Sequence, residues 1–336
     1  MKKNSRAASA CLACFLLFAL FLGGCTPKKN NDMQLSLAYT GSNSFEYFDV
    51  GNDRNADFLS GRASEVCVLS GDSQNESTQE TEDYAYGLYK VSSNTVLQNY
   101  RVTEKIYPAS TTKLLTTLVA LKHCNLSETV TFSYNASHLG VYGAVECGFE
   151  EGDQIMLGDL LAALLIFSGN DAGIAIAEHV SGSVEAFAEL MNEEAQKIGA
   201  VDTHFVNPHG LHNKEHYTTA YDIYLIFNEL IHYNSFLSTI SMPSCEVNYV
   251  DANGNAKSKT FESTNLFFNG TFEVPDGIEI IGGKTGTTYA AGCCLTLLFK
   301  DTNGNTYIAE VFHAPSYEVL YGKMVELMKS VAPRSK

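Results

Sequence analysis

The chain has 336 residues, a formal net charge of −16, 45% hydrophobic residues and 18% charged residues. These values are typical of a globular protein with a sizeable core and exclude wholesale disorder. The acidic balance argues against a nucleic-acid partner, because phosphate binding needs clustered Lys and Arg. No apolar run has the length expected of a multi-pass membrane protein.

The N-terminal residues have the pattern of an export signal. Three basic residues among the first six precede an uncharged, mostly apolar stretch, 7–22, which is typical of a signal peptide. The stretch continues into Gly-Gly-Cys, ending at Cys25, and small residues before a cysteine resemble the bacterial lipobox. We predict a lipoprotein signal peptide over 1–24 and lipidation of Cys25, which would hold an extracytoplasmic protein at the bacterial cell membrane. Ordinary secretion or a short membrane anchor is the alternative.

The segment after Cys25 is polar and rich in Asn, Ser, Asp and Gly, and we predict a tether over 25–62. Residues 63–336 are assigned to one domain. At its start we expect a short strand, Glu65–Leu69, and a solvated acidic loop, Ser70–Asp83.

Six cysteines follow Cys25 at irregular spacing, without a Cys-x-x-Cys pair, so neither a zinc ribbon nor a thioredoxin motif is indicated. They are Cys67, Cys124, Cys147, Cys245, Cys293 and Cys294. Disulfides are permitted outside the cytoplasm, and buried free thiols are equally compatible with the sequence.

The domain is predicted to begin with strands and to continue with helices. Tyr84–Leu97 has the pattern of a hairpin that turns at Ser92-Ser93-Asn94. Apolar periodicity then predicts helices over 110–123, 156–167, 171–179, 183–198 and 218–232. The helix over 156–167 is apolar nearly all round and should be buried.

The last hundred residues are predicted to form strands and one closing helix. Two hairpins turn at Asn-Gly, one over 245–263 and one over 294–313, and Tyr317–Val331 is an amphipathic helix. This order predicts an α/β (α+β) domain, with an antiparallel sheet that joins the two ends of the domain, flanking helices and a helical insertion.

The first motif with chemical potential is Ser110-Thr-Thr-Lys113 at the start of a predicted helix. Positions i and i+3 share a helix face, so the Lys113 amine can lie beside the Ser110 hydroxyl. A serine becomes a good nucleophile when a base takes its proton, and a lysine can be that base if its pKa falls. The structural alternative is a capping serine followed by a surface lysine.

The second motif is Ser168-Gly-Asn170, directly after the buried helix. Ser-x-Asn strings recur in this chain, but here the hydroxyl and the amide lie where polar groups need partners inside the protein.

The third motif is Lys284-Thr285-Gly286-Thr287. Glycine inside a strand often marks the close approach of a ligand or another backbone, and a lysine with hydroxyls suits a substrate carboxylate. The structural alternative is a loop between two strands.

In this order, the three motifs are a signature of penicillin-binding proteins and class A β-lactamases. The surrounding sequence resembles the low-molecular-mass serine D-alanyl-D-alanine carboxypeptidases of peptidase family S11, over roughly Tyr84 to His313. The matching strings are Tyr107-Pro-Ala-Ser-Thr-Thr-Lys113, Ser168-Gly-Asn-Asp-Ala172, Asn207-Pro-His-Gly-Leu211 and Gly283-Lys-Thr-Gly-Thr287. That family often adds a β-rich C-terminal domain and an amphipathic membrane helix, whereas we expect attachment at the N-terminus here.

The resemblance implies a serine β-lactamase/DD-peptidase-like fold and acyl transfer on a peptidoglycan stem peptide that ends in D-Ala-D-Ala. Ser110 would attack the carbonyl of the penultimate D-alanine, Lys113 would accept its proton, and Ser168 would relay a proton to the leaving D-alanine. β-Lactams would acylate Ser110 because they mimic the end of the substrate. No metal or cofactor is expected.

The resemblance also implies the residues that hold the substrate. Asn170 would bind the substrate amide, and Lys284, Thr285 and Thr287, spaced by Gly286, would bind the terminal carboxylate. Backbone N–H groups of Ser110 and Thr287 would form the oxyanion hole.

Three other functions stay open. A class A β-lactamase needs a glutamate that activates water, and no such string lies between Ser168 and Lys284. A transpeptidase would use an amine acceptor. A receptor would bind wall peptides or penicillin without turnover. Four histidines between His204 and His216 suggest zinc weakly, because their spacing lacks the HExxH pattern.

Overall fold

The computed structural model describes residues 66–69 and 83–333. The chain divides into two units, 1–47 and 48–336, and every described residue belongs to the second. The predicted signal peptide (1–24), lipidated Cys25, tether (25–62) and nearly all of the predicted acidic loop lie outside the described residues.

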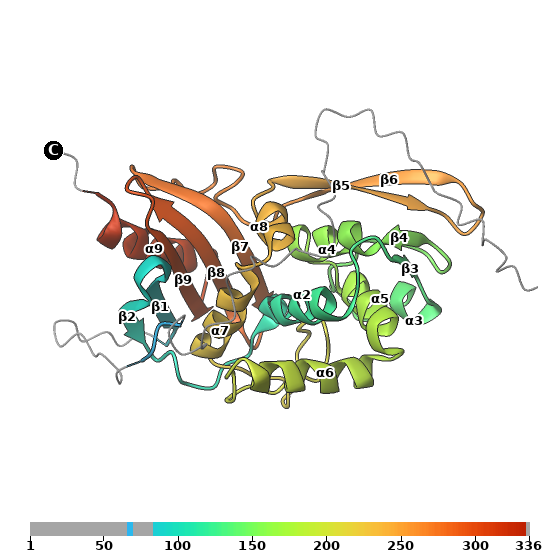
Figure 1. Ribbon diagram of the computed structural model, residues 1–336, viewed down its shortest axis with the longest axis horizontal. Helices are drawn as coiled ribbons and strands as arrows, with labels where there is room; N and C mark the ends of the chain where they lie inside the picture. Colours follow the sequence, from blue (N-terminus) through green and yellow to red (C-terminus); the bar gives the residue numbers. More distant parts are fainter. Residues whose placement is uncertain (1–65, 70–82, 334–336) are drawn as a thin grey trace, which may run out of the picture. The chain divides into compact units, whose positions relative to one another are not determined.

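Among the described residues, five antiparallel strands form the main sheet in the order β2-β1-β9-β8-β7 (Figure 1). They are β1 (Ala85–Lys90), β2 (Thr95–Tyr100), β7 (Ile278–Thr288), β8 (Gly292–Asp301) and β9 (Thr306–Ala314). The turn between β1 and β2 contains a short 3-10 helix, η2 (Val91–Ser93). β1 pairs with β9, so the predicted sheet that joins the two ends of the domain is confirmed.

Helices cover both faces of the main sheet. α9 (Tyr317–Val331) packs on one face and α7 (Ala220–Leu230) on the other, and α2 (Thr112–His123) packs against α7. Successive side chains of β8 point to opposite faces, so Leu297 packs towards α9 while Leu298 packs towards α7. Because both faces are covered, β8 is a nearly continuous apolar run.

The helical insertion contains a second sheet. Its helices are α3 (Tyr134–Ser137), α4 (Leu157–Ile166), α5 (Asn170–Ser181), α6 (Val184–Lys197) and α8 (Asn234–Ile240). The described strands of the second sheet have the order β3-β4-β5-β6, and they are β3 (Thr129–Thr131), β4 (Gln154–Met156), β5 (Ser244–Val250) and β6 (Ala256–Glu262). Side chains of α4 and α5 pack on this sheet.

The prediction of a strand over Glu65–Leu69 is wrong for its described part, 66–69, which is irregular. Side chains take the place of a strand partner: the Cys67 N–H donates to the Tyr224 hydroxyl (2.8 Å), and the Tyr221 hydroxyl donates to the Cys67 carbonyl (2.9 Å). The predicted helices and the three hairpins are present, with ends shifted by a few residues. β3, β4, α3 and α8 were not predicted, because segments this short carry little periodicity.

The cysteines after Cys25 are described, and all six are free thiols; Cys124 is half-buried and the others are buried. Of the two alternatives left open by the sequence, the structure therefore shows free thiols, five of them buried. Within the described ranges, no helix combines the length and apolar character needed to cross a membrane.

Candidate functional site

Ser110 lies in a 3-10 turn, η3 (Ala109–Thr111), that leads directly into α2. Two threonine hydroxyls hold this turn: Thr111 donates to the Pro108 carbonyl (2.7 Å) and Thr112 to the Ala109 carbonyl (2.8 Å). Ala109 has a φ of 47°, a left-handed conformation that a non-glycine residue adopts at an energetic cost. The turn leaves Ser110 half-buried while its neighbours are buried, so the hydroxyl can be reached by a ligand.

Lys113 is fully buried one turn further along α2. Its Nζ lies 3.0 Å from Ser110 Oγ, 2.8 Å from Asn170 Oδ1 and 2.6 Å from the His209 carbonyl oxygen. Burial, and then the nearby Lys284 amine, hold the pKa of Lys113 well below its usual range.

These contacts orient the amine once it is neutral. A neutral amine has two N–H groups and one lone pair, and the Asn170 and His209 oxygens can each accept one N–H. The lone pair is then left for the hydroxyl of Ser110, which can donate its proton to Nζ. The surroundings thus favour the protonation state and the orientation that a general base needs.

Ser168 lies in the sharp link between α4 and α5, Asn170 is the first residue of α5, and both are buried. Ser168 has a φ of 73°, so this link also stores backbone strain. A Cβ on Gly169 would lie 2.2 Å from the Cys147 sulfur, so glycine is required between the two polar residues. The Asp171 carboxylate accepts the Cys147 N–H (2.8 Å), which holds the neighbouring loop against the link.

Lys284 lies on β7, fully buried, and it reaches the second motif. Its Nζ donates to Ser168 Oγ (3.0 Å) and to the Thr285 carbonyl (3.0 Å). Burial lowers the pKa of Lys284 to about 7. The structure therefore brings all three predicted motifs together, while the predicted contact of Lys284 with a substrate carboxylate stays a prediction.

The edge strand β7 packs against η3 at Gly286. A Cβ at this position would lie 2.8 Å from the Ser110 nitrogen and 3.1 Å from the Thr111 nitrogen. Neither of these two backbone nitrogens can move without displacing the turn that carries Ser110. Beside it, Thr287 is exposed and its Oγ1 lies 3.0 Å from the Tyr317 hydroxyl.

We expect Gly286→Ala to push β7 away from η3 and to slow acylation of Ser110 by a fluorescent penicillin about 10- to 100-fold, because small displacements of reacting groups carry large rate costs. The matched control is Gly322→Ala, because Gly322 lies inside α9 with nothing within 4 Å of an added Cβ. The control should gain about 0.5–1 kcal/mol in the free energy of unfolding and keep its acylation rate. Equal acylation rates in the two variants would contradict the close packing at Gly286.

Several contacts within the site were not predicted from the sequence. The His209 carbonyl accepts from Lys113, and the Thr264 and Thr285 hydroxyl oxygens lie 2.5 Å apart. In the string Asn207-Pro-His-Gly-Leu211, the chain turns and the Asn207 side chain accepts the Gly210 N–H at 2.7 Å. A Cβ on Gly210 would lie 1.8 Å from the Ala109 carbonyl oxygen, so this turn packs directly on η3.

The histidines between His204 and His216 have protein partners. His216 Nε2 lies 2.8 Å from the Thr112 hydroxyl, and its Nδ1 accepts the Val206 N–H at 3.1 Å. Burial is the main cause that lowers the pKa of His209 and of His216 to about 3, so both rings are neutral at physiological pH. Their hydrogen bonds support the Ser110 turn and the 207–211 turn.

The family of this chain follows from its match to a family model. The family model for D-alanyl-D-alanine carboxypeptidases, peptidase family S11, matches residues 72–316. The chain belongs to the S11 family. The resemblance inferred from the motifs is thereby confirmed.

Curated S11 relatives match most of this chain. D-alanyl-D-alanine carboxypeptidase DacF of Bacillus subtilis is 34% identical over 224 residues, which cover 65% of this chain and 54% of that protein. D-alanyl-D-alanine carboxypeptidase DacA of Haemophilus influenzae is 30% identical over 250 residues, which cover 73% of this chain and 59% of that protein. The matched region thus spans somewhat more than half the length of these S11 relatives.

A solved structure confirms the predicted fold class for this S11 chain. The crystal structure of the Streptomyces K15 DD-transpeptidase matches with a TM-score of 0.67 and 25% identity, covering 73% of this chain and 94% of that chain. The antiparallel sheet, its flanking helices and the helical insertion form the DD-peptidase-like fold that the motifs implied.

Proposed function

We propose that this protein is a serine D-alanyl-D-alanine carboxypeptidase. It removes the terminal D-alanine from peptidoglycan stem pentapeptides through an acyl-serine intermediate, and β-lactams acylate the same serine. The observation that carries the proposal is the environment of Lys113: a fully buried amine that lies 3.0 Å from Ser110 Oγ and whose other two hydrogen-bond partners are acceptors.

Acylation follows from these contacts. The Ser110 oxygen attacks the carbonyl carbon of the penultimate D-alanine while its proton passes to Lys113. N–H groups of Ser110 and Thr287, on the two sides of the packing contact at Gly286, would stabilise the oxyanion, where one donor is worth about 3 kcal/mol. Collapse of the tetrahedral intermediate breaks the peptide bond, and the departing nitrogen takes a proton relayed through Ser168. Water then hydrolyses the ester.

Substrate recognition would use the outer edge of β7. An extended peptide can pair with the edge of a sheet, and within the described residues β7 is an edge strand of the main sheet. The Thr285 and Thr287 hydroxyls and the positive field of Lys284 would bind the terminal carboxylate. Asn170 would hold a substrate amide while it also accepts from Lys113.

The test is mass measurement of a pentapeptide after incubation with the protein. Loss of one D-alanine with gain of water is the expected result. A product joined to an added amine would show transpeptidation, acylation by penicillin without any peptide turnover would show a receptor, and rapid turnover of penicillin would show a β-lactamase. Each of these three results would overturn the proposal.

We also propose that the chain acts outside the cytoplasm and that lipid on Cys25 attaches it to the membrane. The support is the signal-like N-terminal sequence and its Gly-Gly-Cys string. Palmitate labelling in the native host should disappear in Cys25→Ala, and labelling that persists would contradict the anchor.

The pH dependence of kcat/KM should reflect the protonation of both Lys113 and Lys284. Lys113 is active as a base when neutral, so protonation reduces the rate on the acid side, at a pH well below the usual pKa of lysine because its pKa is lowered. Lys284 is useful when charged, and its pKa is about 7, so recognition of the carboxylate should weaken above neutral pH. We expect a bell-shaped profile of kcat/KM with the alkaline limb expressed in KM. A profile that rises steadily to pH 9 would contradict the role of Lys284.

A further inference from the structure

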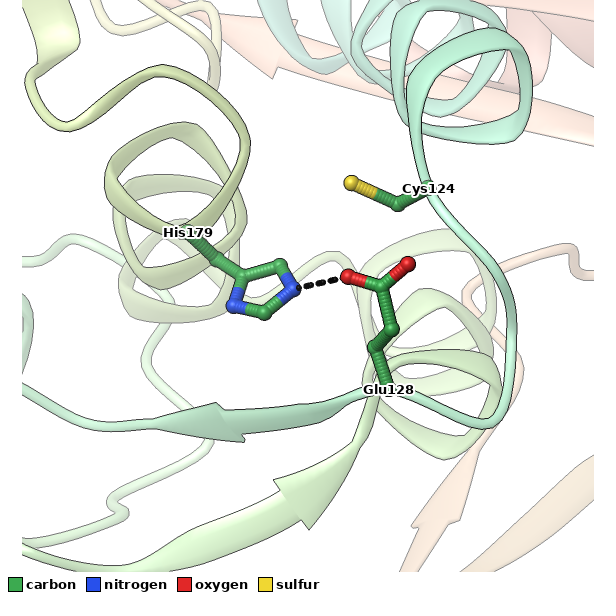
Figure 2. A group of neighbouring side chains, drawn as sticks. All are labelled: Cys124, Glu128 and His179. Atoms are coloured by element: carbon green, nitrogen blue, oxygen red, sulfur yellow. Dashed lines mark hydrogen bonds and ion pairs between the residues drawn. The ribbon is translucent and has the colours of Figure 1, made fainter. Parts of the chain in front are cut away.

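Three side chains of different chemistry converge at the C-terminal ends of two helices (Figure 2). Cys124 ends α2, His179 lies in the last turn of α5, and Glu128 lies in the segment that leads into β3. Their sulfur, nitrogen and oxygen ligand atoms all lie within 4.8 Å of one another. This cluster was not predicted from the sequence, because Glu128 and His179 are 51 positions apart.

We propose that Cys124, Glu128 and His179 form a zinc-binding site. Thiolate, imidazole and carboxylate are the donor types that Zn²⁺ prefers, whereas Mg²⁺ and Ca²⁺ select sets of oxygen ligands. Three protein ligands leave the fourth tetrahedral position for water. This inference is independent of the proposed carboxypeptidase activity.

The geometry needs a small adjustment to accept the ion. Ligand atoms around a tetrahedral zinc lie about 3.3–3.8 Å apart, given bond lengths of about 2.0–2.3 Å, so no pair needs to close by more than about 1.5 Å. His179 Nε2 and Glu128 Oε2 are 2.9 Å apart and must separate slightly as the ion replaces their hydrogen bond. Side-chain rotation can supply shifts of this size.

Neighbouring groups support the carboxylate as a ligand. Glu128 Oε1 accepts the Asn125 N–H at 2.6 Å, which fixes the carboxylate and leaves Oε2 directed at His179. Such outer contacts orient metal ligands in established sites. The side chains of His179 and Glu128 are 22% and 38% exposed, so an ion can enter from solvent.

The electrostatic surroundings favour a cation at this place. The C-terminal ends of α2 and α5 both carry partial negative charge, and the Glu128 carboxylate adds a full negative charge. Zinc would bind Cys124 as the thiolate, with the thiol proton released to solvent.

The position of the site indicates what the metal would do. α2 and α5 carry Lys113 and Asn170 near their N-terminal ends, whereas the cluster lies at the opposite ends. His179 lies nine positions after Asn170, which is about 13 Å along the helix, so the ion would be remote from the reacting atoms. It would fasten the two helices together and stabilise the domain.

The experiment uses the full chain, treated with chelator, dialysed and titrated with zinc chloride by calorimetry. We expect one ion per chain, and a rise in Tm of about 5 °C when free zinc exceeds the Kd a hundredfold. Cobalt should give the absorption of a thiolate-to-cobalt charge transfer, and magnesium should give no shift in Tm. Absence of one-to-one zinc binding would overturn the proposal.

Variants assign the ligands. Cys124→Ser and His179→Ala should each weaken zinc binding at least 100-fold, and Glu128→Gln, which changes a partly exposed side chain with little risk to folding, at least tenfold. The matched control is His123→Ala, since His123 is exposed and next to Cys124. It should keep its affinity within twofold. The assignment would be overturned if Glu128→Gln kept the zinc affinity of the parent protein, or if His123→Ala lost it.

Discussion

Ser110→Ala is expected to abolish covalent labelling by penicillin and to reduce D-alanine release by at least about 10⁴-fold. No other hydroxyl is held by the buried Lys113 amine within the described residues, so a water molecule would have to replace the nucleophile. Losses of this size are typical when the nucleophile of a serine hydrolase is removed. Intact-mass spectrometry measures the adduct, and an enzymatic assay for free D-alanine measures turnover.

Ser238→Ala is the control for this substitution. Ser238 is exposed on α8, where its hydroxyl bonds to the Asn234 carbonyl of its own helix. The control should label and turn over like the parent protein. Release of D-alanine by Ser110→Ala at more than a hundredth of the parent rate would refute the acyl-serine mechanism.

Lys113→Met is expected to slow acylation about 10³-fold while the protein stays folded. Methionine has nearly the length of lysine, so it fills the same buried space, but it can neither accept the Ser110 proton nor donate to Asn170 and His209. Two buried oxygens lose a donor, and each loss costs about 1–3 kcal/mol, offset by removing a desolvated amine. Stopped-flow acylation and thermal unfolding measure the two effects separately.

Lys122→Met tests whether the effect is specific. Lys122 is on the same helix and forms ion pairs with Glu194 and Glu229, remote from the hydroxyl of Ser110. This variant should lose some stability and keep its acylation rate. An acylation rate within tenfold of the parent in Lys113→Met would contradict the role of Lys113 as general base.

The strong local patterns predicted the elements that carry the site. Ser110 and Lys113 are three residues apart, so helix geometry alone placed their side chains on one face, and the structure has them in contact. The helix over 156–167 was recognised because it is apolar nearly all round, and its end located Ser168. The alternative of a surface lysine at position 113 is wrong, since Lys113 is fully buried.

Long-range contacts could not be predicted in the same way. Lys284 contacts Ser168 across 116 residues, and the His209 carbonyl contacts Lys113 across 96 residues. Every residue has a backbone carbonyl, so no sequence motif could have indicated that the carbonyl of His209 accepts a hydrogen bond from Lys113. The Cys124–Glu128–His179 cluster was not predicted for a related reason. Its members lie on separate elements, and their proximity depends on how α2 and α5 pack.

By itself, the sequence determined the helices, the hairpins, the three motifs and the likeness to the S11 family, because these depend on side-chain periodicity, turn chemistry and spacing along the chain. The tertiary structure alone decided which protonation state the buried amines favour, which carbonyl accepts from Lys113, and where Gly286 meets the Ser110 turn. The reason is physical: desolvation and hydrogen bonding act over a few ångströms in space, and packing sets which parts of the chain come within that range.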